Sequence, residues 1–201
     1  MLAVWVLELV VFDRAPDLAE RLFEIRSDRV AWMGSLVPMW LVEPWTLVTS
    51  TLSHHPARPM HLLLNGLFLF FFGPVVERLT GVRRFLILFF VAGALTGVAQ
   101  VELSRALGSG LPALGASGAL MMLFGMLVAL LPREKIHLYG ILPLPMWVAG
   151  IVFAVLDLIG ALNPRSDVGN FAHLAGMALG LAYGIHMLGD LKRRGLRLTR
   201  A

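Results

Sequence analysis

Residues 111–131 read LPALGASGALMMLFGMLVALL, a run of 21 residues without a charged side chain. A transmembrane helix needs about 20 apolar residues, so this run predicts a helix that spans a bilayer. Four other runs bounded by charges have about the right length for spans or near-spans: 62–76, 85–101, 138–161 and 168–188. The pattern predicts an all-α, polytopic membrane protein.

The composition indicates the same class. Hydrophobic residues make up 58% of the 201 residues and charged residues 15%, against about 45–50% and 25% in soluble domains. This disfavours an ordinary water-soluble domain, and the length suits about six spans with their loops in a single membrane domain, residues 1–201. The chain has no cysteine, which excludes a disulfide framework, a thiol nucleophile and thiolate metal sites.

The first residues form a sixth apolar stretch. Residues 1–12 are apolar apart from one glutamate, but twelve helical residues rise only about 18 Å against a hydrocarbon core of about 30 Å. We interpret them as a short or truncated first span of a six-helix bundle, with spans two to six in residues 61–189. Residues 13–60 are too long for an ordinary connection. They predict a long interfacial first loop with Trp40 and Trp45 at headgroup depth, with a plain solvated loop as the alternative.

The distribution of charge predicts the orientation. With six spans, ten basic residues fall on one side in short segments that include the tail, residues 190–201. By the positive-inside rule, both termini then face the cytoplasm. The basic tail is interpreted as a topological anchor beside a span, not as a nucleic-acid site. Arginine outnumbers lysine, and the expected location is the plasma (inner) membrane of a prokaryote.

Four polar side chains within the spans are the first candidates for function, because such groups are costly inside a bilayer. His61 and Asn65 open the second span at positions i and i+4, which places them on one helix face. Ser117 lies near the start of the fourth span and His173 near the start of the sixth. In an alternating bundle these three spans run from outside to inside, so the four side chains converge toward the outer face.

These residue types suit nucleophilic catalysis. A serine becomes a nucleophile when a base takes its proton, and histidine, with a pKa of about 6.5, is the usual base near neutral pH. Ser117 and His173 fit these roles. Attack on a carbonyl creates an oxyanion, to which Asn65, His61 and the backbone amide of Ser117 are able to donate hydrogen bonds.

Glycines accompany the candidate residues. Gly115 and Gly118 flank the serine, and two further glycines follow the histidine by three and seven residues, Gly176 and Gly180. Small residues at this spacing let helices pack closely, which would bring the imidazole within reach of the serine. Taken singly, each feature has a plainer interpretation: a helix-packing surface, an interhelical hydrogen bond or a satisfied interior histidine. Their shared depth favours the catalytic interpretation.

Competing chemistries find little support in the sequence. Residues 115–119 lack the last glycine of GxSxG, and neither HExxH nor GxxxxGK[ST] occurs. Asp157 is the only aspartate within a span, whereas an intramembrane aspartyl mechanism needs two carboxylic acids. His54 and His55, together with His61, make a weak case for a metal. We therefore expect neither a metal nor an organic cofactor.

Three motifs, in order and on the right spans, resemble those of rhomboid intramembrane serine proteases: HLLLN at 61–65, GASG at 115–118 and AHLAG at 172–176, followed by Gly180. The resemblance covers about residues 43–188. It implies a six-helix core with a water-filled cavity that opens outward. There, a dyad of Ser117 and His173 would cleave peptide bonds in or near the transmembrane segments of membrane-protein substrates, without a cofactor.

The chain departs from this pattern at two positions near the site. Many rhomboids have Trp-Arg in the first loop, where this chain has Trp45 followed by Thr46, so the arginine's anchoring role is lost or moved. One turn after the nucleophile, the family often places an aromatic residue against the base histidine, where this chain has Met121. The alternative function is a catalytically silent rhomboid-like protein that binds transmembrane helices for trafficking or degradation. Such proteins usually lack the serine or the histidine, and this chain keeps both.

Overall fold

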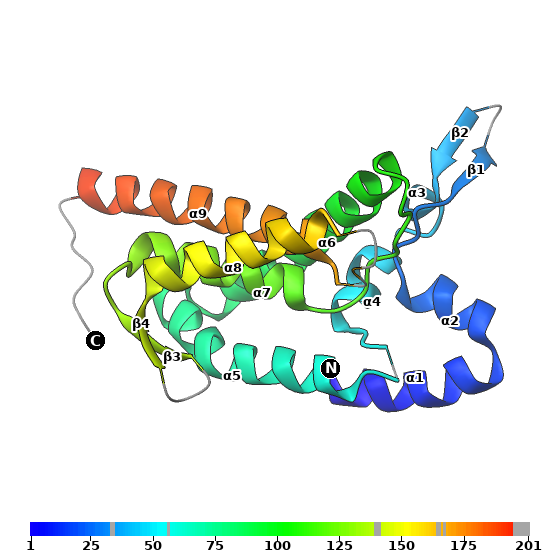
Figure 1. Ribbon diagram of the computed structural model, residues 1–201, viewed down its shortest axis with the longest axis horizontal. Coiled ribbons are helices and arrows are strands. Elements are labelled where there is room, and N and C mark those ends of the chain that lie inside the picture. Colours follow the sequence, from blue (N-terminus) through cyan, green and yellow to red (C-terminus); the bar gives the residue numbers. More distant parts are fainter. Residues whose placement is uncertain (33–34, 56, 139–141, 164–165, 167, 195–201) are drawn as a thin grey trace.

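The computed structural model describes residues 1–201 except 33–34, 56, 139–141, 164–165, 167 and 195–201. Most of the described residues are helical, and the long helices lie side by side in one bundle (Figure 1). The helices are α1 (Leu2–Arg14), α2 (Pro16–Phe23), α3 (Met39–Val42), α4 (Thr46–Leu52), α5 (Pro59–Thr80), α6 (Val82–Ala106), α7 (Ser117–Leu130), α8 (Met146–Ala161) and α9 (Asn170–Arg193). Two antiparallel hairpins pair β1 (Arg29–Trp32) with β2 (Ser35–Pro38) and β3 (Lys135–Leu138) with β4 (Leu142–Pro145).

Within the described part of the chain, three helices are long and apolar enough to cross a bilayer: α5, α6 and α9, with 22, 25 and 24 residues. The helices α7 and α8 are also apolar but have only 14 and 16 residues. Large apolar side chains stay exposed on the outside of the bundle, such as Phe70 and Phe71 of α5 and Ile159 of α8. Exposed apolar surface of this kind is expected where helices face lipid.

The helix α7 begins later than the sequence predicted. We expected a span over residues 111–131, but residues 111–116 are not helical and the helix begins at Ser117. Pro112 has no N–H to donate, and Gly115 has a φ of 108°, a left-handed conformation that a helix does not contain. The predicted start was therefore wrong, and the candidate serine is the first residue of its helix.

The helix α8 also begins later than predicted. We expected a span over residues 138–161, but the helix begins at Met146 and is preceded by the β3–β4 hairpin, in which Lys135 lies opposite Pro145. Pro143 and Pro145 favour an extended backbone and oppose a helix. Hydropathy alone does not distinguish an apolar hairpin from an apolar helix. The predicted all-α class is therefore corrected by two short hairpins.

The described residues of segment 13–60 form short helices and a hairpin at one end of the bundle (Figure 1). Its buried residue Glu43 accepts a hydrogen bond from Arg21 Nε at 2.9 Å and a longer one from Arg26 at 3.4 Å. The indole of Trp45 donates to the backbone oxygen of Arg21 at 2.9 Å. Arg21 and Arg26 thus hold this segment in place, although the residue after Trp45 is a threonine and not an arginine.

Two glycines of α6 leave room for side chains of segment 13–60 to pack against this helix. A Cβ on Gly93 would come within 2.6 Å of Thr51 Cγ2, and one on Gly97 would meet the Ile25 side chain. Ile25 also exchanges backbone hydrogen bonds of 2.9 Å with Ala113, just before the candidate serine. The first segment therefore supports the loop that leads into α7.

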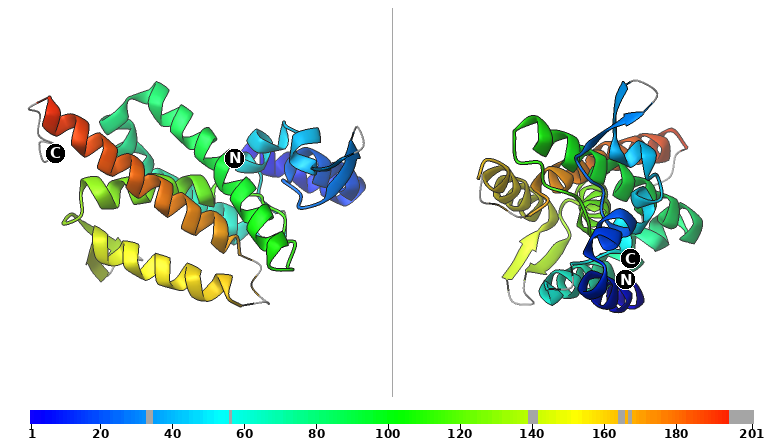
Figure 2. Two further views of the ribbon diagram at one scale, coloured as in Figure 1. Left: turned by 90° about the horizontal axis from the view of Figure 1, so that it is seen from above. Right: turned by 90° about the vertical axis from the view of Figure 1, so that its right-hand side faces the viewer.

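The helix α7 lies in the middle of the bundle, between α5, α6, α8 and α9 (Figure 2). Ten of its 14 residues are buried. The ring of the fully buried residue Phe124 packs edge-on against Phe68, Phe72 and Phe153, with ring centroids 5.4–5.7 Å apart. These contacts join α5 and α8 to α7 through apolar burial, the main source of packing energy.

The interface between α7 and α9 is made by glycines on both helices. A Cβ on Gly176 would strike the Gly118 carbonyl oxygen, and a Cβ on Gly180 would strike that of Met122. From the other side, a Cβ on Gly125 would lie 2.5 Å from the Met177 oxygen. The two backbones are therefore in direct contact, as small residues allow.

Replacing Gly180 with alanine is expected to destabilise the bundle. The added methyl would also lie 2.7 Å from the backbone nitrogen of Met126, and a backbone cannot move aside as a side chain can, so we expect a loss of about 1–3 kcal/mol. Gly189→Ala on the same helix is the control, because its methyl meets only the Arg193 side chain at 3.8 Å. Thermal unfolding in detergent measures both. Equal stability of the two variants would contradict this account of the interface.

Candidate active site

One large cavity of about 2000 Å³ brings the four predicted polar side chains together: His61 and Asn65 from α5, Ser117 from α7 and His173 from α9. Its lining also includes apolar residues of α5 and of α8. The sequence placed these four residues at one depth, and in the structure they line one space.

Ser117 is the partly buried first residue of α7. The first turn of a helix has backbone N–H groups without intrahelical partners, and the N-cap residue Ala116 makes no side-chain cap. A Cβ on the next residue, Gly118, would lie 3.3 Å from the Cβ of Ala172. The neighbour of the serine thus meets the neighbour of His173 across the α7–α9 interface.

His173 lies in the first turn of α9, which is held from α6. The Gln100 side-chain oxygen accepts hydrogen bonds from the backbone nitrogens of Phe171 and Ala172 at 3.1 and 3.2 Å. No hydrogen bond joins His173 to Ser117 among the residues that the structure describes. Catalytic hydrogen bonds in unliganded enzymes are often long and tighten when substrate binds.

The ring nitrogen Nδ1 of His173 has a partner that the sequence did not predict. Nδ1 lies 2.8 Å from Oδ1 of Asp157 on α8, and both side chains are largely buried. In the sequence, Asp157 served only as an argument against an aspartyl mechanism. The signal that could have found it is its isolation, because an ionisable residue within a span needs a partner.

Asn65 is held by a second residue that the sequence missed as a site component. Its Nδ2 lies 2.8 Å from Nε2 of His54, and Nδ1 of that histidine lies 3.3 Å from the Leu52 oxygen. Because an amide nitrogen can only donate, Nε2 accepts and the proton of His54 is on Nδ1. Burial, helped by the charge of His61, lowers the pKa of His54 to about 4. His54 is therefore neutral near pH 7, as this arrangement requires.

The helix α1 is joined to the site by a hydrogen bond with His54. The backbone nitrogen of His54 donates to Oε2 of the fully buried residue Glu8 at 3.0 Å, and the rings of His54 and His61 meet edge to face, with centroids 5.2 Å apart. Within the described ranges, no group of three or more histidine, cysteine and acidic side chains is arranged to hold a metal ion.

Gly115 places the loop before the serine against the two α5 side chains. A Cβ there would lie 2.7 Å from His61 Cε1 and 3.8 Å from Asn65 Nδ2, and the Gly115 nitrogen donates to the Ser50 oxygen at 2.8 Å. Its φ of 108° also favours glycine. Met121, one turn after Ser117, lines the same cavity.

Comparison with known proteins identifies the fold. Residues 42–190 match the family profile described as "Rhomboid domain". The chain belongs to the rhomboid family. The match includes the four candidate residues Ser117, His173, Asn65 and His61, and it leaves α1, α2 and the β1–β2 hairpin outside.

Individual rhomboids resemble the chain over most of its length. The rhomboid protease GlpG of Haemophilus influenzae is 32% identical over 144 residues, which are 71% of this chain and 69% of that protein. The putative rhomboid protease YdcA of Bacillus subtilis is 32% identical over 153 residues, 76% of this chain and 71% of that protein. The mitochondrial RHOMBOID-like protein 12 of Arabidopsis thaliana is 31% identical over 149 residues, 67% of this chain and 44% of that protein. The chain thus matches less than half of the plant rhomboid and about 70% of the bacterial ones.

Proposed function

We propose that the chain is a serine endopeptidase that hydrolyses peptide bonds in or near the transmembrane segments of other membrane proteins. The observation that carries this proposal is the convergence of Ser117, His173, Asn65 and His61 on one cavity. Membership of the rhomboid family and similarity to proteins named as rhomboid proteases support it.

The chemistry uses Ser117 and His173 as a dyad. Nε2 of His173 takes the proton of Ser117 Oγ as that oxygen attacks the substrate carbonyl carbon. The carbonyl oxygen becomes an oxyanion, and the imidazolium then gives its proton to the leaving amine as the peptide bond breaks. Water, activated by the same imidazole, releases the acyl group from the serine. No cofactor takes part.

The oxyanion is bound by three donors: Asn65, His61 and the Ser117 amide. Asn65 uses one amide hydrogen for His54, and the second is available for the oxyanion. Gly115 keeps the intervening backbone close to both α5 side chains. Donors fixed before the reaction stabilise the developing charge without reorganising.

The shape of the cavity suits a transmembrane substrate. Its α5 side is lined by Leu64, Leu67 and Phe71, and its α8 side includes Phe153. The three α5 side chains are exposed on the outside of the bundle as well. An apolar substrate segment is thus able to approach from the lipid, and its helix must open locally before a carbonyl is attacked.

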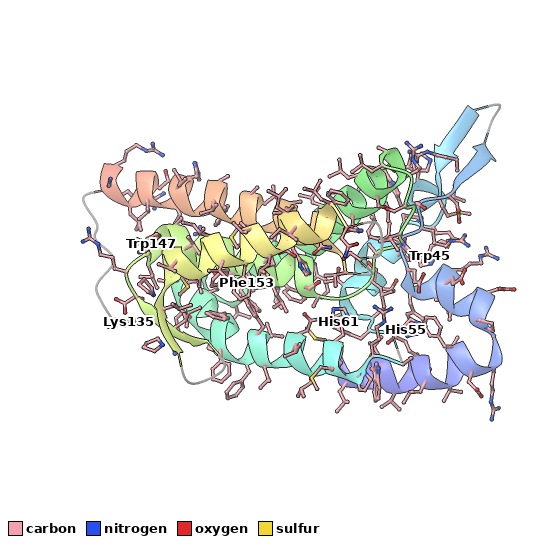
Figure 3. All side chains as sticks on the ribbon, in the orientation of Figure 1. Trp45, His55, His61, Lys135, Trp147 and Phe153 are labelled. Carbon is pink, nitrogen blue, oxygen red and sulfur yellow. The ribbon has the colours of Figure 1, made fainter. Side chains whose placement is uncertain are left out.

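The proposed membrane arrangement has six spans, both termini in the cytoplasm and the site toward the outer face of a prokaryotic plasma membrane. Two exposed tryptophans, Trp45 and Trp147, lie at opposite ends of the molecule, with His61 on the Trp45 side (Figure 3). Tryptophan favours the interface between membrane and water. The last residues of the basic tail, 195–201, lie outside the described residues.

Cleavage of a membrane-embedded substrate tests the proposal. The purified protein is reconstituted in liposomes with a single-span substrate that carries small and helix-destabilising residues near the membrane surface. We expect fragments from the wild type and none from Ser117→Ala. Binding of the substrate without fragments would support the silent helix-binding protein instead. Cleavage that is equal in wild type and variant would refute the assigned nucleophile.

A further inference from the structure

We propose that Asp157 is a positioning residue for His173, so that a third side chain supports the proposed dyad of Ser117 and His173. This inference rests on the proposed protease function. Its basis is the contact of 2.8 Å between Asp157 Oδ1 and His173 Nδ1, which joins α8 to the first turn of α9.

The packing of α8 against α9 sets this contact. The two helices run in opposite directions (Figure 1), so Gly160, three residues after Asp157, faces Asn170, three residues before His173. A Cβ on Gly160 would lie only 2.5 Å from Asn170 Oδ1. The close approach one turn away therefore brings the carboxylate and the imidazole together.

The Asp157 carboxylate has one partner among the described residues. The side chains of Asp157 and His173 are 12% and 14% exposed, and among the described residues His173 is the only side chain found paired with Asp157. An ionisable group in a span is costly unless it is paired. A carboxylate at this position, directed at the base, points to a role in the reaction.

The contact determines which nitrogen of His173 is the base. A carboxylate accepts, so Nδ1 carries the proton and Nε2 keeps the lone pair that removes the Ser117 proton. The negative charge then stabilises the imidazolium without taking its proton. Among the described residues, His61 of α5 also interacts electrostatically with His173, while Gln100 of α6, which binds the neighbouring residue Ala172, is neutral.

Two substitutions separate positioning from simple helix packing. Asp157→Asn keeps the shape and an acceptor oxygen but removes the charge, and Asp157→Leu removes the hydrogen bond as well. The matched control is Asp190→Asn, because Asp190 also faces a histidine, His186 at 3.6 Å, but on the exposed part of α9. Each protein is first shown to unfold at a similar temperature.

The first readout is the rate of substrate cleavage in liposomes, with kcat and KM determined separately. We expect Asp157→Asn and Asp157→Leu to lower kcat by about 100-fold or more, to leave KM nearly unchanged, and Asp190→Asn to match the wild type. If folded Asp157→Asn and Asp157→Leu both keep the wild-type kcat, the inference is overturned while the protease function stands.

The second readout needs no substrate. Nitrogen-15 NMR spectra of histidine-labelled protein, assigned by comparison with His173→Ala, report which ring nitrogen carries the proton. We expect Nδ1 to be protonated in the wild type and the preference to be lost in Asp157→Leu. An unchanged His173 spectrum in Asp157→Leu would overturn the inference even in an inactive protein. Absence of Ser117-dependent cleavage in the wild type would count against the protease function separately.

Discussion

Replacing His173 with alanine is expected to lower the cleavage rate by at least about 10⁴-fold. The Ser117 hydroxyl is a weak nucleophile at neutral pH without a base to take its proton, and the leaving amine would also lose its acid. KM for the substrate should change little, because the apolar walls of the cavity remain. Cleavage in liposomes under saturating substrate measures the effect.

The matched control for this variant is His186→Ala. His186 lies on the same helix and is exposed, far along α9 from the cavity, so its loss should leave the rate unchanged. The double variant Ser117→Ala with His173→Ala should be no slower than either single variant, because the two residues act as a unit. A His173→Ala protein that keeps a tenth of the wild-type rate would show that another group is the base.

Replacing Asn65 with leucine is expected to lower kcat by about 10²–10³-fold, the effect of losing one oxyanion donor. Leucine has nearly the same shape, so the substrate should still bind. Asn65 also contacts His54, so Asn65→Leu removes that hydrogen bond as well. The variant His54→Phe removes that contact and keeps the amide.

Comparison of these two variants separates the roles of Asn65. If the amide binds the oxyanion, Asn65→Leu should be slower than His54→Phe by at least about tenfold. Equal losses would mean that Asn65 matters through its hydrogen bond with His54, and the oxyanion would then depend on His61 and the Ser117 amide. Single-turnover rates at saturating substrate provide the comparison.

The long helices were predictable because charged residues bound their apolar runs. The interior of α5, α6 and α9 lies within the predicted spans, and each helix extends past them into charged or polar residues such as Arg78 and Arg105. The starts of α7 and α8 were not predictable from hydropathy. There, glycine and proline delay the start of the helix inside an uncharged run, at Gly115 and Pro145.

Three of the candidate site residues could be predicted from the sequence for a geometric reason. His61, Ser117 and His173 each open a helix that runs in the same direction, so alternating topology places them at one end of the bundle. Asp157 and His54 were not assigned, because their partners lie 16 and 11 residues away on other elements. Only tertiary packing, through contacts such as that of Gly160 with Asn170, shows those pairs.

Labelling with a fluorophosphonate probe tests the central claim most directly, because it reports an activated serine without a known substrate. The detergent-purified wild type, Ser117→Ala and His173→Ala are compared after all three are shown to be folded. The account predicts labelling of the wild type and of neither variant. Labelling that persists in Ser117→Ala, or its absence from a folded wild type beside a labelled rhomboid protease, would contradict it.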